Sequence, residues 1–287
     1  MADRLRIGLS LNPSAELDPA AEAKHAESLG FDLLTVMDHL HGTRPSYETW
    51  TVMAWAAAAT ERMLIGSDVL GMPYRHPAVT AKMAETLQRL SGGRLVLGIG
   101  GGGSREEFGA FGLPVRSAKE TVDAFEEGVE IIRRLWAGGP VSFDGEHYSV
   151  QQATISPVPD RPIPMWFGSY GPRSLAMTGR LADGWIPSYR FAPPDRWTAM
   201  RDRVRRAAEA AGRDPESLDY AYNVGVRVDE RAEQRPGMIA GEPGRVVDQL
   251  RELIDMGVTF PVLWAAGEGF EQRERLAADV LPALRQS

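Results

Sequence analysis

Residues suited to acid–base chemistry stand together at Asp38-His39, directly after an apolar segment at residues 31–37. A histidine titrates near neutral pH and could take a proton from, or give one to, an oxygen whose carbon exchanges a hydride. The spacing leaves a second interpretation open, in which His39 only bonds to backbone where a strand ends. We take His39 as the candidate catalytic residue.

A second site-like stretch occupies residues 66–77 and includes Asp68 and Val69. It has the pattern of a buried strand that ends abruptly, because glycines and prolines impose special backbone there. Pro77 suits the first position of a helix, where its missing N–H costs nothing, and His76 before it is expected to cap that helix. Two neighbouring strand ends with polar residues suggest one shared pocket.

Two glycine-rich segments could lie against a ligand. Gly100-Gly101-Gly102-Gly103 would let backbone come close to a flat or phosphorylated molecule. Gly168-Ser169-Tyr170-Gly171 leads into a helix N-terminus, where free N–H groups and the dipole attract phosphate, and Arg173 adds positive charge. A plain loop is the alternative for each. The histidines and carboxylates lack the spacing of metal ligands, so we expect no metal site.

The scaffold must bring several strand ends together. Eight apolar segments, each followed by a helical pattern, lie at residues 6–11, 31–37, 63–70, 94–99, 162–168, 184–187, 220–226 and 260–264. This order predicts a (β/α)8 TIM barrel that spans residues 1–287 as one domain. The alternative is an open doubly wound sheet, but that fold more often stops at five or six strands and the first βα turn lacks its glycine fingerprint.

Local patterns refine these elements. Residues 141–150, with Asp144-Gly145 at the turn, predict a hairpin inserted after the fourth helix. Asp18 is expected to cap the first helix, and Ser117 with Glu120 has capping-box spacing at the start of the fourth. The third helix is expected to bury a stripe made of Val79, Met83, Leu87 and Leu90.

Composition narrows the class of protein. The net charge of −7 and pI near 5.4 argue against a nucleic-acid partner, because proteins bind the phosphate backbone through a basic face. The absence of cysteine excludes disulfides and a cysteine nucleophile, and a cytoplasmic location is the simplest expectation. No signal peptide and no apolar run of about 20 residues is visible, so we expect no membrane association.

Arginine makes up 29 of the 32 basic residues, which base composition alone could explain. Five arginines nevertheless follow the second to the sixth predicted strands, one after each: Arg44, Arg75, Arg105, Arg173 and Arg190. In a barrel they would ring the face that carries the site. Such a ring would suit a polyanionic ligand tail.

Together these residues make the chain similar, over nearly its whole length, to the luciferase-like monooxygenase superfamily. The resemblance is to its branch that uses the deazaflavin coenzyme F-420 (F420). It rests on Asp38-His39, Val69-Leu70 with Pro73-Tyr74-Arg75-His76-Pro77, Leu97-Gly98-Ile99-Gly100-Gly101-Gly102, Pro162-Ile163-Pro164, Ala182-Asp183-Gly184-Trp185 and Val280-Leu281-Pro282.

The resemblance implies a barrel with an insertion, a coenzyme ring at its mouth and the coenzyme phosphate near the fifth-strand loop. It implies a non-prolyl cis peptide at Asp68–Val69 that backs the ring. The coenzyme-binding residues would be Asp38, Asp68, Val69, Gly100, Gly101, Gly102, Gly168, Ser169, Gly171 and Arg173. The reaction would be hydride transfer to or from a small organic substrate, with His39 as acid or base, in a homodimer.

One departure bears on the substrate. In the sugar-phosphate dehydrogenases of this branch an acidic residue follows the fourth-strand glycines, whereas Gly103 stands there in this chain. Their substrate is therefore not carried over. Trp50, Trp166 and Trp264 could line an apolar pocket or pack in the core. Two other functions remain open, an FMN-dependent monooxygenase of the same superfamily and a flavin- or deazaflavin-binding barrel without turnover.

Overall fold

Eight parallel strands close into a barrel in the computed structural model, which describes residues 5–11, 14–40, 42, 45–232, 235–267 and 270–286. Around the barrel the order is β10, β12, β1, β2, β3, β5, β8 and β9, and β9 pairs again with β10. Their bounds are β1 Gly8–Leu11, β2 Leu33–Val36, β3 Leu64–Ser67, β5 Leu95–Gly100, β8 Met165–Gly168, β9 Gly184–Trp185, β10 Asp219–Val228 and β12 Phe260–Ala265. The predicted (β/α)8 barrel is confirmed.

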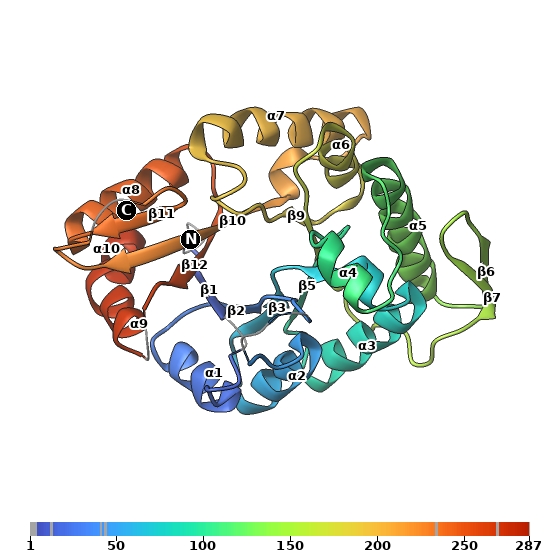
Figure 1. Ribbon diagram of the computed structural model, residues 1–287, viewed down its shortest axis with the longest axis horizontal. Helices are drawn as coiled ribbons and strands as arrows, with labels where there is room; N and C mark the ends of the chain where they lie inside the picture. Colours follow the sequence, from blue (N-terminus) through green and yellow to red (C-terminus); the bar gives the residue numbers. More distant parts are fainter. Residues whose placement is uncertain are drawn as a thin grey trace.

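Helices surround the strands as a ring (Figure 1). They are α1 Pro19–Ser28, α2 Thr49–Ala59, α3 Pro77–Leu90, α4 Arg105–Ala110, α5 Ala118–Ala137, α6 Pro172–Leu181, α7 Pro194–Ala210, α8 Pro243–Asp255, α9 Glu271–Arg275 and α10 Leu281–Arg285, with a π-helical turn at Leu276–Val280 and short 3-10 turns at Met72–Tyr74 and Pro215–Ser217. None of the helices in the described part of the chain is long and apolar enough to cross a membrane.

The expected helix caps are confirmed. The Asp18 carboxylate accepts from the amides of Ala20 and Ala21, and Ser117 forms a complete capping box with Glu120. The ring of His76 accepts from the amide of Ala78 at 3.2 Å. These side chains satisfy amides that a helix leaves unbonded in its first turn.

The inserted hairpin is present, with Asp144 as the last residue of its first strand and Gly145 as the first residue of the turn. Strands β6 Val141–Asp144 and β7 Ser149–Ala153 pair antiparallel at the side of the barrel, beyond α5 (Figure 1). The loop at residues 145–148 is held by Glu127 of α5, whose carboxylate accepts from the amides of Glu146, His147 and Tyr148 at 2.9 Å. A side chain distant in sequence therefore sets the turn.

Three short elements differ from the sequence prediction. The predicted third strand divides into β3 and β4 (Leu70–Gly71), with Asp68 and Val69 between them. Strand β11 (Met238–Gly241) pairs with β10 outside the barrel, and helix α4 follows β5. All three are too short for hydrophobic periodicity to reveal.

The predicted apolar stripe of α3 is wrong at two of its four positions. Val79 is 52% exposed and Leu90 is 81% exposed. The buried side instead carries Ala81, Ala84 and Leu87, with Gln88, whose amide oxygen accepts from the amide of Leu95. Small alanines let the helix lie close to the strands, so side-chain size alone pointed to the wrong face.

The apolar core has two parts. Inside the barrel lie Leu33, Val96, Trp166, Ile186, Ala221, Phe260 and Val262. A larger cluster fills the space between strands and helices. Apolar side chains therefore fill the interior of the barrel, and polar side chains appear at the carboxyl ends of the strands.

At the opposite, amino end of the barrel two charged side chains hold the connections. The guanidinium of Arg94 donates to the carbonyls of Ala57, Thr60, Met63 and Ser91 at 2.7–3.0 Å. The carboxylate of Glu27 accepts from the amides of residues 61–63, the nearest being Arg62 at 2.7 Å. Both side chains therefore satisfy backbone groups of the segment that leads into β3, and Arg94 also binds the turn between α3 and β5.

Candidate active site

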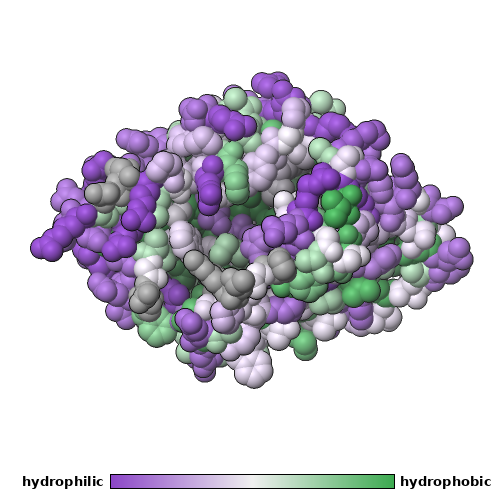
Figure 2. Space-filling view, viewed as in Figure 1, coloured by the Kyte–Doolittle hydropathy of each residue, from purple (hydrophilic) through white to green (hydrophobic). Residues whose placement is uncertain are grey.

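A pocket of about 330 Å³ opens at the carboxyl ends of the strands, where barrel enzymes place their sites. The surface is hollowed near the centre of the ring of helices (Figure 2). Of the residues proposed from sequence, the pocket brings together Asp38, His39, Asp68, Val69, Gly100, Gly101, Gly102 and Gly168. The remaining lining residues are Met37, Gly71, Tyr74, Gly103, Ser104, Tyr170, Ile186, Ser188, Phe191 and Asn223.

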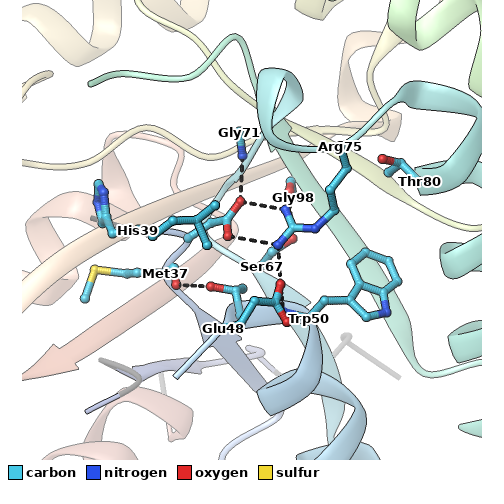
Figure 3. A network of polar contacts seen from close by, with 12 residues as sticks. Met37, His39, Glu48, Trp50, Ser67, Gly71, Arg75, Thr80 and Gly98 are labelled. Atoms are coloured by element: carbon cyan, nitrogen blue, oxygen red, sulfur yellow. Dashed lines mark hydrogen bonds and ion pairs between the residues drawn. The ribbon is translucent and has the colours of Figure 1, made fainter. Parts of the chain in front are cut away.

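The side chain of Asp38 is fully buried and forms an ion pair with an arginine. The guanidinium of Arg75 donates to its two oxygens at 3.0 and 3.3 Å, and the amide of Gly71 donates at 3.0 Å. The same guanidinium contacts Glu48, which caps α2 (Figure 3). Asp38 therefore joins the ends of β2 and β4 to α2, and its carboxylate is engaged within the protein.

The charges in this network support one another. Burial alone would lower the pKa of Arg75, but its bonds to Asp38 and Glu48 raise it above the ordinary value. Burial would raise the pKa of Glu48, but bonds from Thr51, Trp50 and Arg75 lower it. The Arg75 guanidinium and the Glu48 carboxylate thus stay ionised, and Arg75 is not a free charge for a ligand.

His39 stands on the pocket wall with its side chain 68% exposed. Its Nδ1 lies 3.3 Å from Oε2 of Glu107, a carboxylate on α4 that is only 3% exposed. The other oxygen of Glu107 accepts from the amide of Leu40, directly after the histidine. One buried carboxylate therefore holds both the ring and the backbone of the His39 loop, which leaves Nε2 for a ligand.

Tyr74 adds a further hydrogen bond to the same carboxylate. Burial, and then the hydrogen bond to Glu107, raise the pKa of Tyr74 above its ordinary value, so its hydroxyl stays protonated. Sequence reasoning missed Glu107 because it missed α4. The signal was present, since Ser104 precedes Glu107 by three residues, the spacing of a helix cap, and the Ser104 hydroxyl does accept from the Glu107 amide.

The Asp68–Val69 peptide bond is cis, as the resemblance implied. Val69 points toward two strand ends that carry no side chain. A Cβ at Gly168 would lie 2.8 Å from a methyl group of Val69, and one at Gly100 would lie 3.1 Å from it. The result is a smooth apolar wall between β5 and β8, which fits the face of a flat ring.

The other glycines of the loop after β5 differ in whether a side chain would fit at their positions. Gly102 has φ +85°, and a Cβ there would lie 2.3 Å from the ring of Phe108. A Cβ at Gly101 would lie 2.6 Å from Thr121. A Cβ at Gly103 would have nothing within 4 Å, so this position opens into free space where a larger side chain would fit.

Three residues proposed for phosphate binding do not line the pocket. Ser169 is buried and its hydroxyl shares a 2.8 Å hydrogen bond with Thr178. Gly171 precedes α6, where its amide donates to the Ser174 hydroxyl. Arg173 pairs with Asp123 of α5 at 2.7 Å. The charge expected from Arg173 is thus already paired with a neighbouring helix.

The predicted arginine ring is wrong in two of its members, because Arg75 and Arg173 are paired within the protein. Arg105 and Arg190 are exposed, and Arg44 lies outside the described residues. The tryptophans do not line the pocket either. Trp50 and Trp166 are core residues, whereas Trp264 is 39% exposed in a separate recess beside Arg227 and Met238. In the described ranges, no three His, Cys, Asp or Glu side chains gather to hold a metal ion.

Comparison with known proteins gives a family. The sequence profile described as luciferase-like monooxygenase matches residues 12–237. The chain is 31% identical to the F420-dependent glucose-6-phosphate dehydrogenase of Intrasporangium calvum, over 91% of this chain and 92% of the relative. It is 40% identical to the enzyme of the same name from Beutenbergia cavernae, but there the alignment spans 63% of this chain and 56% of the relative.

Solved structures agree on the fold. An F420-dependent secondary alcohol dehydrogenase in complex with an F420-acetone adduct superposes with a TM-score of 0.88 at 21% identity, over 98% of this chain and 99% of that one. The coenzyme F420 dependent tetrahydromethanopterin reductase of Methanopyrus kandleri superposes with a TM-score of 0.85 at 22% identity, with the same coverage. At these identities the likeness establishes a shared barrel.

Proposed function

The chain belongs to the luciferase-like monooxygenase family, and from that membership we propose an oxidoreductase that transfers a hydride between coenzyme F420 and a small organic substrate. The F420-dependent dehydrogenases among its relatives support this choice of coenzyme over FMN, one of them across nine-tenths of the chain. The observation that carries the proposal is the pocket itself, which is lined by an apolar wall at Val69 and by a histidine held by a buried carboxylate.

The residues present fit the coenzyme. A pocket of this volume suits a tricyclic ring, and Val69 with Gly100 and Gly168 offers it a flat surface. F420 would supply the carbon that exchanges the hydride. The protein would orient the two partners, with Ile186 and Phe191 helping to exclude water from the pocket.

His39 is proposed to exchange the proton that accompanies the hydride. Its Nδ1 faces the Glu107 carboxylate, so Nε2 is the atom that would take a proton from, or return it to, the substrate oxygen. Glu107 would position the ring through its contact with Nδ1. The substrate of the dehydrogenase relatives is not part of this proposal, because Gly103 offers open space where the resemblance led us to expect an acidic residue.

Titration of the purified protein with F420 and separately with FMN, followed by fluorescence, tests the coenzyme. We expect saturable binding of F420 in the micromolar range or tighter, about −8 kcal/mol or better, and much weaker binding of FMN. Tight FMN binding with no response to F420 would instead favour the flavin-dependent monooxygenases of the family. Binding of either ligand without turnover of any alcohol, aldehyde or sugar substrate would favour a carrier.

Replacing Glu107 with Gln should lower kcat by about tenfold to a hundredfold, because a hydrogen bond to a charged group is worth about 1.5–3 kcal/mol. Gln keeps an acceptor for the Leu40 amide, so the loop should stay in place and F420 affinity should change little. Glu106→Gln, on the exposed side of the same helix, is the matched control. If both variants turned over like the wild type, Glu107 would not position His39.

The remaining parts of the proposal come from the resemblance and from composition. They are a homodimeric assembly, a cytoplasmic location and the absence of a nucleic-acid partner.

A further inference from the structure

Asp68 forms the polar floor of the pocket, and the mechanism proposed above does not use it. Its Oδ2 accepts hydrogen bonds from the side-chain amide of Asn223 on β10 and from the hydroxyl of Ser10 on β1, the latter at 3.4 Å. Both bonds go to the same oxygen. Oδ1 is therefore the atom left to meet whatever fills the pocket that Asp68 lines.

The ionisable side chains that share the pocket with Asp68 have other partners or are neutral. Asp38 is paired with Arg75, and His39 faces Glu107. Tyr170, from the loop after β8, is neutral, because burial and then the charge of Asp68 raise its pKa to about 12, against the bond its oxygen accepts from the Ser188 amide. Among the described residues, no arginine, lysine or histidine forms an ion pair with Asp68.

Asp68 is thus a carboxyl group without a cation in an enclosed site. Burial raises the pKa of Asp68 to about 6, against the opposing effect of the bonds from Asn223 and Ser10. A flat ring stacked on Val69 would remove the remaining water from the neighbouring carboxyl. Removal of water disfavours a carboxylate that has no cation, so ligand binding should favour the neutral acid further.

The position of the acid proton follows from the bonds. Because Oδ2 accepts from Asn223 and Ser10, the proton of the neutral acid belongs on Oδ1, the oxygen left for a ligand in the pocket that Asp68 lines. A ligand must then offer an acceptor. The pyrimidinedione end of a deazaflavin carries two carbonyl oxygens, and a ring stacked on Val69 would place one edge near the adjacent Asp68, which lines the same pocket.

We propose that Asp68 binds coenzyme F420 as a neutral acid, donating a hydrogen bond to a ring carbonyl, so that coenzyme binding takes up a proton. The proposal rests on the proposed function and adds to it a specific contact with the coenzyme. The sign follows from linkage. If coenzyme binding raises the pKa of the Asp68 carboxyl, the protein binds F420 with full affinity at a pH below the pKa of the free protein. The affinity then falls as the pH rises through that pKa, because the carboxyl must first take up a proton.

The test compares wild type with Asp68→Asn, in titrations of F420 alone by fluorescence at pH 5, 6, 7 and 8. Asn keeps the shape, accepts from Asn223 and Ser10 through its oxygen, and donates into the pocket at every pH. We expect similar Kd values for the two proteins at pH 5. Above pH 6 the wild-type Kd should rise relative to the variant by up to about tenfold per pH unit.

Ionisation of the coenzyme itself affects both proteins alike and cancels in the ratio of their Kd values. His39→Gln should keep the wild-type pH dependence, which separates Asp68 from the pocket histidine. A ratio that stays constant with pH would overturn the proposal, as would tighter binding to wild type at pH 8. Absence of F420 binding to wild type would instead remove the proposed function.

A second measurement covers the case in which Asp68→Asn does not fold. Calorimetric titration of wild type with F420 at pH 7, in buffers of different ionisation enthalpy, counts the protons exchanged on binding. We expect net uptake that approaches one proton and that disappears at pH 5, where the free carboxyl is already protonated. Zero uptake or proton release at pH 7 would contradict the proposal without any variant.

Discussion

Replacing His39 with Ala is expected to slow hydride transfer by about 10²- to 10⁴-fold, the range typical of a lost general acid or base. The dissociation constant of F420 should stay within about threefold of wild type, because the side chain is 68% exposed and its removal takes little from the pocket wall. Single-turnover absorbance of the coenzyme measures the first quantity and fluorescence titration the second.

The control is His76→Ala, which removes a histidine from the cap of α3 and not from the pocket. It should change turnover little. Equal losses of rate and of coenzyme affinity in His39→Ala would contradict the assigned role, since they would mean that His39 holds the coenzyme and does not move a proton. Unchanged rates would mean that His39 has only a structural role at the end of its strand.

Replacing Arg75 with Met is expected to lower the free energy of unfolding by about 3–5 kcal/mol, because it leaves a buried carboxylate without its cation. Asp38 has no exposed side-chain surface, and Arg75 supplies two of the hydrogen bonds it accepts. Denaturant unfolding measures the effect. The double variant Asp38→Asn/Arg75→Met should recover part of the loss, since the remaining amide carries no charge and can still accept from Gly71.

Arg62→Met provides the comparison for an exposed arginine. Its side chain is 72% exposed and lies 3.9 Å from Glu61, so its removal should change stability by less than about 1 kcal/mol. If Arg75→Met were as stable as wild type, the network around Asp38 would not hold the strand ends together. If it were destabilised but still bound F420 normally, the network would be structural only.

The barrel could be predicted from sequence because its strands are buried on both faces. Each appears as a short apolar run bounded by glycine, proline or a polar residue, and eight such runs in one chain leave few folds to consider. The bulge at Asp68–Val69 could be placed only through the resemblance to a family. Residue types alone indicated no more than an abrupt strand end.

The polar partners could not be predicted, because they are distant in sequence. The sequence predicts Arg75 as a charge on the active face for a ligand, yet its partner is Asp38, which lies 37 positions earlier. Glu107 meets His39 across 68 positions. Periodicity describes the faces of one element at a time, so it cannot say which carboxylate a given cation will meet. Asn223 was visible as a polar residue inside an apolar strand, a pattern that could have marked it.

The two ends of the barrel are secured by different means. At the amino end, Arg94 and Glu27 bind main-chain carbonyls and amides, and these groups are the same whatever side chains the turn carries. At the carboxyl end, a side chain added at Gly103 would meet nothing within 4 Å of its Cβ. A substitution at Gly103 would therefore change the mouth of the pocket without touching the main-chain groups that Arg94 and Glu27 bind at the other end of the barrel.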